Sequence, residues 1–76
     1  MESLGKRLER LRESRGWTPQ EFAEKARVPY MTIYRLEKEI YTDTHTAIAA
    51  RLARTLGVSL DVLVGLYETQ GTHEPA

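Results

Sequence analysis

The sequence predicts an all-α protein, a compact bundle of five short helices. Apolar residues recur at the three- and four-residue spacing of helices, and each such segment follows a residue that can cap a helix. Seventy-six residues form one domain, because so short a chain buries only about 60% of its unfolded surface and cannot divide its core. The chain has no cysteine, so packing must stabilise it without disulfides or a thiolate zinc site.

The first helix is expected within residues 3–16. Its apolar residues share one face: Leu4, Leu8 and Leu11. Ser3 can cap its start, and Gly16 can end it in the left-handed conformation. Basic side chains surround most of the remaining surface, so the apolar face is expected to pack on the core.

The second helix is expected over about residues 19–25, because four start signals coincide in the stretch WTPQEF. Thr18 is placed as the cap, Pro19 occupies the first helical position, and Glu21 completes a capping box. Trp17 precedes the cap and can pack on Phe22, as in a hydrophobic staple.

The third helix is expected over about residues 29–39. Pro29 resists continuation of the preceding helix and suits the first turn of a new one, so the chain must turn sharply before it. One side is apolar and is expected in the core: Ile33, Leu36 and Ile40. The opposite side repeats the same helical spacing with other residues: Met31, Tyr34, Arg35 and Lys38. This second stripe has no role in the core and is free for binding.

A polar loop leads to the fourth helix, with Asp43 or Thr44 as the expected cap. Its apolar residues are Ile48, Leu52 and Leu56, and Gly57 is expected to end it. A fifth helix is expected over residues 60–66, with Ser59 as its cap and Val58 able to pack on Leu63. The domain therefore covers residues 3–67, and residues 68–76, which lack periodicity, are expected to form a flexible tail.

The formal net charge is zero, although the charges are unevenly distributed. The first 54 residues hold all eleven basic side chains and eight acidic ones, a net charge of +3, and the remaining residues carry −3. A basic face on a neutral molecule is therefore possible. No apolar run approaches the roughly 18 residues of a membrane span and no signal peptide is evident, which indicates a soluble cytoplasmic protein without a membrane partner.

The sequence offers no site for catalysis or for a metal. His45 and His73 are far apart and lack acidic neighbours that would complete a ligand set. No hydroxyl group has a base at a spacing that would activate it as a nucleophile. We therefore expect neither an enzyme nor a cofactor.

Two short helices joined by a tight turn, the second with an outward polar stripe, form a helix-turn-helix pattern. The segment SRGWTPQEFAEKARVPYMTIYRLE resembles the helix-turn-helix of Cro and the phage repressors, the XRE family. The later ARTLGVSLDVLVG is similar to the segment that closes the same five-helix domain. The resemblance spans about residues 4–66 and implies a lambda-repressor-like domain that binds double-stranded DNA.

In that family the helix after the turn enters the major groove. Matched residue by residue, the resemblance implies base contacts from Tyr30, Met31 and Arg35. Arg35 can donate two hydrogen bonds to guanine, worth about 1–3 kcal/mol of discrimination, while Met31 or the Tyr30 ring can contact a thymine methyl group. The expected phosphate contacts are Gln20, Arg27, Thr32, Tyr34, Lys38, Tyr41, Thr42 and Thr44. Met31 and Tyr34 could instead be ordinary surface residues or contact a protein.

The resemblance also implies a buried or half-buried ion pair between Arg12 and Glu37 that would hold the third helix at its angle; the alternative is that both are solvated charges. Three features depart from the family pattern. Arg27 stands where a glycine is usual and must accept a less comfortable backbone. Gln20 lies one place later than the usual glutamine, which is here Pro19. The glycine that usually follows the third helix is absent, so this helix is expected to run longer.

The leading hypothesis is a sequence-specific transcriptional regulator, a repressor that binds a roughly palindromic operator as a homodimer. The dimer surface would lie on the fifth helix and beyond: Val62, Leu66 and Tyr67. Leu66 and Tyr67 could equally fold back on the first or fourth helix. The near-neutral loop after the third helix predicts a modest electrostatic contribution to affinity. The alternative is a protein-interaction module, such as an antitoxin or anti-repressor partner, that uses the exposed face of the third helix.

Overall fold

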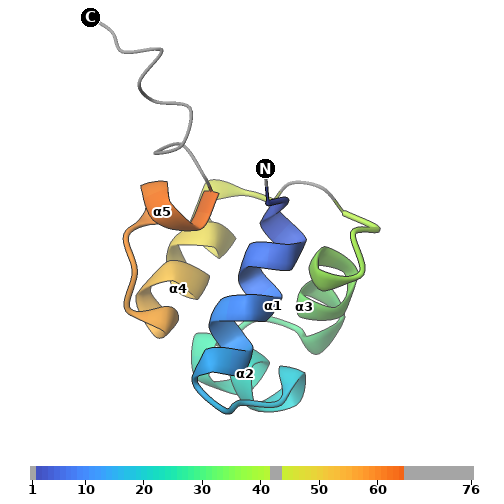
Figure 1. Cartoon of the computed structure of the whole chain (residues 1–76). Coiled ribbons are helices and arrows are strands. Elements are labelled where there is room, and N and C mark those ends of the chain that lie inside the picture. The colour runs from blue at the N-terminus through green and yellow to red at the C-terminus, as the bar shows by residue number, and fades with distance from the viewer. Residues whose placement is uncertain (1, 42–43, 65–76) are drawn as a thin grey trace, which may run out of the picture.

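The computed structural model describes residues 2–41 and 44–64, which contain five α-helices and no strand. The helices are α1 (Leu4–Ser14), α2 (Pro19–Ala26), α3 (Tyr30–Glu37), α4 (Thr46–Leu56) and α5 (Leu60–Val64) (Figure 1). α1 runs through the middle of the view with α3 on one side, α4 and α5 on the other, and α2 across the lower end. The all-α prediction is confirmed. No helix within these residues is long and apolar enough to cross a membrane.

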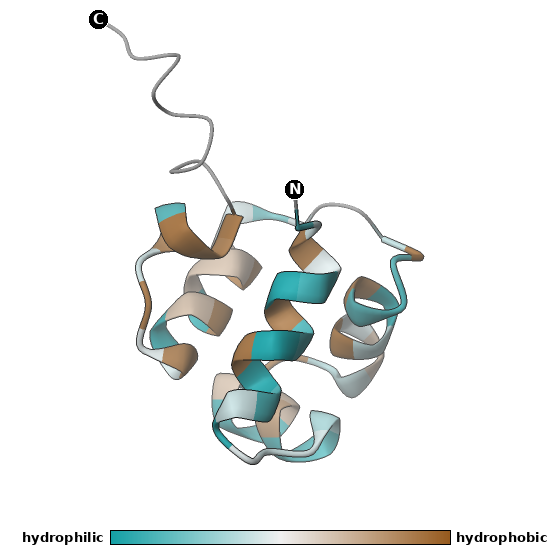
Figure 2. Ribbon diagram, in the orientation of Figure 1, coloured by the Kyte–Doolittle hydropathy of each residue, from teal (hydrophilic) through white to brown (hydrophobic). Residues whose placement is uncertain are grey.

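Apolar side chains from all five helices meet in a single core. The largest fully buried ones are Phe22, Leu8, Ile33, Leu36, Leu52, Leu56 and Leu63. Figure 2 shows the same pattern, because hydrophobic segments alternate with hydrophilic ones along α1. Burying each such side chain contributes about 1.5–3 kcal/mol, so these residues supply most of the favourable free energy of folding.

α1 and α3 approach each other very closely at Gly5. A Cβ atom added to Gly5 would collide with the backbone carbonyl oxygen of Leu36. Only glycine therefore allows α3 to lie so near α1. Gly5 was not among the residues predicted to shape the fold, although a glycine inside a helical pattern is itself a signal of close packing.

Three helices begin as their capping residues predict. The Ser3 hydroxyl accepts a hydrogen bond from the Lys6 N–H at 3.2 Å, and the Ser59 hydroxyl accepts one from Val62 at 3.1 Å. At the start of α2 the capping box is complete. Thr18 accepts from the Glu21 N–H at 3.1 Å, and the Glu21 carboxylate accepts from the Thr18 N–H at 2.9 Å. The Trp17 and Phe22 rings stack with centroids 6.0 Å apart, which confirms the expected staple.

α3 ends earlier than the sequence predicted. Its last residue is Glu37, and Glu39 adopts the left-handed conformation with φ of 62°. The N–H of Ile40 then donates to the Arg35 carbonyl at 2.8 Å, which closes the helix end. The prediction that Ile40 lies in the core is wrong, because its side chain is 61% exposed.

The start of α4 also differs from the prediction. His45 is the capping residue, in place of the predicted Asp43 or Thr44, and its side chain makes no capping hydrogen bond. Asp43 lies outside the described residues, as do Thr42, Leu66, Tyr67 and the predicted tail 68–76. α2 extends one residue beyond the predicted range, to Ala26.

The turn between α2 and α3 confirms the strained backbone expected at Arg27. Arg27 has φ 59° and ψ 46°, the left-handed region that glycine adopts without cost. The turn is closed by a hydrogen bond from the Val28 N–H to the Ala23 carbonyl at 3.1 Å. Arg51 of α4 donates to the Arg27 carbonyl at 3.0 Å, so the turn is tied to α4 as well.

Replacing Arg27 by glycine should stabilise the fold. Arg27→Gly relieves the left-handed strain and keeps the backbone carbonyl that Arg51 binds, so the free energy of unfolding should rise by about 1 kcal/mol in urea titrations. Glu24→Gly is the matched control on an exposed interior position of α2 and should lower it by about 1 kcal/mol. If both variants were destabilised alike, Arg27 would not be strained.

Candidate nucleic-acid interface

The outer side of α3 presents a continuous set of large side chains to solvent. Tyr30, Met31 and Tyr34 are 37%, 42% and 37% exposed, and Lys38 at the helix end is exposed too. Arg35 is half-buried on the same side. The opposite side of the helix buries Ile33 and Leu36 completely. The helical spacing thus separates a core face from a free face, as the sequence predicted.

Rings and cations on this face contact one another. The Tyr30 and Tyr34 rings lie 6.1 Å apart, and the Lys38 ammonium lies 5.9 Å from the centroid of the Tyr34 ring. Arg35 sits over the Tyr41 ring at 5.7 Å, and its Nη1 donates a long hydrogen bond of 3.5 Å to the Tyr41 hydroxyl. These contacts limit the positions that each side chain can take before any ligand binds.

The turn after α3 explains how Tyr41 reaches Arg35. The left-handed Glu39 reverses the chain, and the Tyr41 N–H donates to the Arg35 carbonyl at 3.0 Å. Tyr41 therefore returns along the helix that the chain has just left. The sequence placed both residues at the interface, although it could not show that they touch.

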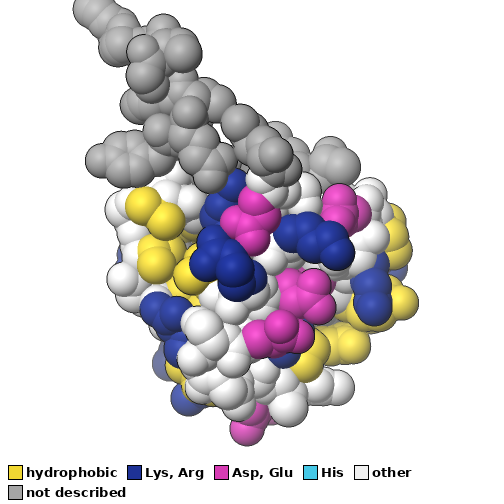
Figure 3. Space-filling view, in the orientation of Figure 1, with side chains coloured by type: hydrophobic (Ala, Val, Ile, Leu, Met, Phe, Trp, Pro, Cys, Tyr) yellow, Lys and Arg dark blue, Asp and Glu magenta, His cyan; other side chains and the backbone are white. Residues whose placement is uncertain are grey.

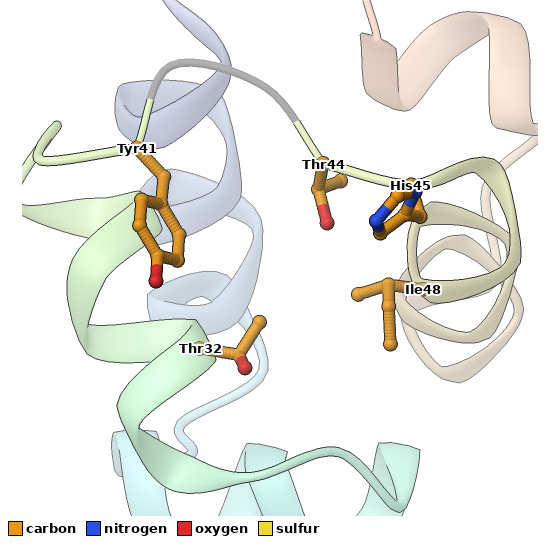
Figure 4. A pocket seen from close by; sticks show the side chains of 5 residues that line it. All are labelled: Thr32, Tyr41, Thr44, His45 and Ile48. Carbon is orange, nitrogen blue, oxygen red and sulfur yellow. The ribbon is translucent and has the colours of Figure 1, made fainter.

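A hollow of about 530 Å³ lies between α3 and the start of α4. Its lining residues are Thr32, Tyr41, Thr44, His45 and Ile48. Figure 4 shows Tyr41 and Thr32 extending into the hollow from the α3 side and Thr44 and Ile48 from the α4 side. Three hydroxyl groups and an imidazole beside the Ile48 side chain suit a ligand whose surface carries hydrogen-bond acceptors, such as a sugar–phosphate strand. We call it the hydroxyl hollow.

The structure brings together only some of the residues predicted to contact phosphate. Thr32, Tyr41 and Thr44 line the hydroxyl hollow, and His45 joins them without having been predicted. Gln20 is exposed at the start of α2 and does not line this hollow, and Arg27 lines a separate one beside α2 and α4. Within residues 2–41 and 44–64, no group of three or more possible metal ligands occurs.

Comparisons with known proteins agree with this architecture. The model of a family described as "Helix-turn-helix" matches residues 8–63. The chain belongs to this helix-turn-helix family, in its XRE type. The family comprises DNA-binding transcription regulators and is not a class of enzymes.

Two named proteins show how similar the relatives are. The chain is 35% identical over 72 residues to the HTH-type transcriptional regulator ImmR of Bacillus subtilis (strain 168), a match that covers 95% of this chain and 56% of ImmR. A crystal structure of SinR, the master regulator for biofilm formation, in complex with DNA has a TM-score of 0.77 at 27% identity, covering 79% of this chain and 95% of that one. The structure of a SinR–SinI complex has a TM-score of 0.78 at 27% identity, and the match covers 93% of this chain and 67% of that one. The chain thus spans little more than half of ImmR.

A buried ion pair sets the position of α3 in this helix-turn-helix domain. Arg12 donates from Nε and Nη2 to the two Glu37 carboxylate oxygens at 2.8 and 2.9 Å, and the side chains are only 9% and 8% exposed. Arg12 Nη1 also donates to the Trp17 carbonyl at 2.7 Å. The hydrogen bonds that Arg12 donates to the Glu37 carboxylate raise the pKa of its guanidinium further above the ordinary value, so the group stays charged. One side chain thereby joins α1, the entry to α2 and the end of α3.

Two further arginines hold helices together, and neither was predicted from the sequence to do so. Arg7 is 3% exposed and donates to the carbonyls of Leu63 at 3.2 Å and Glu2 at 2.9 Å. Arg15 donates to the Leu56 carbonyl at the end of α4. Arg7 was detectable, because it falls at the helical spacing of the apolar residues on either side of it.

Removing one member of the buried pair should be costly. Glu37→Ala leaves the Arg12 charge buried without its carboxylate and should lower the free energy of unfolding by about 3–5 kcal/mol in urea titrations. Glu13→Ala is the matched control, because Glu13 lies 3.8 Å from the same guanidinium but is 63% exposed; it should cost less than about 1 kcal/mol. Equal small losses in both variants would show that the buried pair does not hold α3.

Proposed function

We propose that this protein is a sequence-specific DNA-binding repressor that acts as a homodimer on a roughly palindromic operator. The observation that carries the proposal is the free face of α3 beside the hydroxyl hollow, in a domain of the helix-turn-helix family. Bound there, the protein would exclude other proteins from the operator. SinR, which has a similar fold, was crystallised in complex with DNA, and this supports DNA as the ligand.

The bases would be contacted from the first two turns of α3. Arg35 can donate two parallel hydrogen bonds to one guanine, and its contact with Tyr41 orients the guanidinium in advance. Met31 and the Tyr30 ring are exposed beside it and suit thymine methyl groups. Such a face discriminates bases chiefly through Arg35.

The phosphates would be contacted on both sides of α3. Thr32, Tyr41 and Thr44 offer hydroxyl donors in the hydroxyl hollow, where the first N–H groups of α4 also favour an anion. Lys38 and Tyr34 flank the base-reading residues. The other proposed phosphate contacts are Gln20, Arg27 and Thr42, of which Thr42 lies outside the described residues.

The dimer surface is proposed on α5 and the residues after it. Val62 is 38% exposed on α5, while Leu66 and Tyr67 lie outside the described residues. A two-fold dimer would place two copies of α3 about one helical turn of DNA apart. The DNA-binding domain is proposed to cover residues 3–67.

A salt titration tests DNA binding directly. If each dimer contacts several phosphates, its affinity for duplex DNA should fall on the order of 10³-fold between about 50 and about 200 mM salt, because bound counterions are released. Fluorescence anisotropy measures the affinity, and analytical ultracentrifugation of the complex should find two chains per operator duplex. An affinity that does not change with salt concentration would contradict electrostatic binding to phosphates. A complex with one chain per duplex would contradict the homodimer.

Arg35→Ala tests the base contact. The variant should lose about 1–3 kcal/mol of preference for the selected operator over a duplex changed at one guanine, because the two hydrogen bonds are lost. Lys38→Ala is the control on the same face and should weaken binding to all sequences alike. Selection from a random DNA pool would supply the operator. A preference unchanged by Arg35→Ala would assign discrimination to other residues.

A protein partner is a second candidate for the same face. Ile40 and Tyr41 are 61% and 44% exposed beside the tyrosines of α3, and apolar and aromatic exposure of this kind is typical of protein interfaces. The chain itself would then be a protein-interaction module, such as an antitoxin or anti-repressor partner. SinR, the structural neighbour, also forms a complex with the protein SinI. Absence of binding to any random duplex at low salt would favour this candidate over the first.

A further inference from the structure

A second hollow, of about 270 Å³, lies between the end of α2 and the second half of α4. Its lining residues are Lys25, Ala26, Arg27, Arg51, Arg54 and Thr55. Four of these are cations, and no carboxylate lines the hollow. We call it the basic hollow. The sequence placed only Arg27 at an interface, because the other cations come from two helices that meet only in the fold.

Among residues 2–41 and 44–64, no ion pair reaches the four cations of the basic hollow. Within residues 2–41 and 44–64, the ion pairs engage arginines of α1 with Glu2, Glu13 and Glu37. Figure 3 shows the resulting mixture of basic and acidic groups on the face around α1. In the basic hollow, Lys25 lies 5.1 Å from the Trp17 ring centroid and Arg51 donates to a carbonyl, and neither contact neutralises a charge.

The two hollows follow one another along one side of α4. Ile48 lines the hydroxyl hollow, whereas Arg51 and Thr55 line the basic hollow. These residues stand at i, i+3 and i+7 and so share a helix face. At 1.5 Å per residue, Ile48 and Thr55 are about 10 Å apart along the axis of α4.

We infer that the basic hollow binds phosphate groups of the same DNA strand that enters the hydroxyl hollow, so that α4 extends the interface beyond α3. The inference rests on the proposed function. Arg27, Arg51 and Arg54 can each donate forked hydrogen bonds to phosphate oxygens, while Lys25 adds a point charge. The hydroxyl hollow and the basic hollow lie along one face of α4, which favours a nucleic acid strand over an acidic protein segment. Electrostatic attraction thus comes from the α2–α4 side and not from the near-neutral loop after α3.

The test is the slope of log affinity against log salt concentration for duplex DNA. Each lost phosphate contact should make the slope shallower by about 0.9, which is roughly a 3.5-fold smaller loss of affinity between about 50 and about 200 mM salt. Arg54→Gln should therefore reduce the slope by one contact and Arg51→Gln with Arg54→Gln by two. For Arg54→Gln, base preference should stay as in the wild type, because Arg54 does not lie on α3.

Two further variants separate charge from folding. Arg27→Gly removes a cation of the basic hollow from a backbone that prefers glycine, so a shallower slope in that more stable protein cannot come from partial unfolding. Lys6→Gln removes one exposed charge from α1, outside both hollows, and should leave the slope unchanged.

The outcomes distinguish this inference from the proposed function. A wild-type slope in the Arg51→Gln and Arg54→Gln double variant overturns the inference alone, and so does an equal reduction by Lys6→Gln, which would indicate a general effect of charge. A wild-type protein that binds no duplex at low salt overturns the proposed function, and the inference with it.

Discussion

The buried ion pair between Arg12 and Glu37 is the contact on which the position of α3 depends. Removing both charges from water carries a desolvation penalty that can match their attraction, so the pair adds little net stability over an apolar pair of similar size. Its value lies in direction, because the two parallel hydrogen bonds accept few relative orientations of α1 and α3. Gly5 lets the two helices come close enough to form them. The free face of α3 is therefore aimed by a contact on the opposite side of the same helix.

Arginines extend the same principle to the other helices. Helices of 5 to 11 residues leave many end carbonyls without partners, since the last four carbonyls of any helix lack one within it. Guanidinium groups from elsewhere in the chain meet carbonyls at three such ends: Arg7 at Leu63, Arg15 at Leu56 and Arg51 at Arg27. Each bond joins two helices and adds a cation near the negative end of one of them. In a domain with so small a core, apolar packing alone does not fully fix the positions of the helices relative to one another, and these hydrogen bonds help to fix them.

Features of the fold that depend on neighbouring residues could be predicted from the sequence, whereas features that depend on contacts between distant segments could not. The stretch WTPQEF contains every group of the α2 capping box within four residues, so the start of α2 could be read from sequence. The end of α3 depends on Glu39 accepting a left-handed backbone, which its residue type disfavours, and the helix was therefore predicted to run too long. In the candidate site, helical spacing alone was enough to predict which residues form the outer stripe of α3. The place of His45 in the hydroxyl hollow could not be foreseen, because it requires α3 and α4 to lie side by side.

The net charge of zero does not describe how charge is distributed over the surface of this protein. The chain has as many acidic as basic residues. Several of the acidic side chains, however, form ion pairs with arginines of α1, and three others lie after residue 60 in the sequence. Those pairs stabilise helix positions, whereas Lys25, Arg51 and Arg54 gather in the basic hollow, which no carboxylate lines. Because screening limits exposed charges to a range of about 10 Å, a distant acid does little to cancel such a cluster. A polyanion would therefore be attracted by the local cluster of cations, even though the net charge of the molecule is zero.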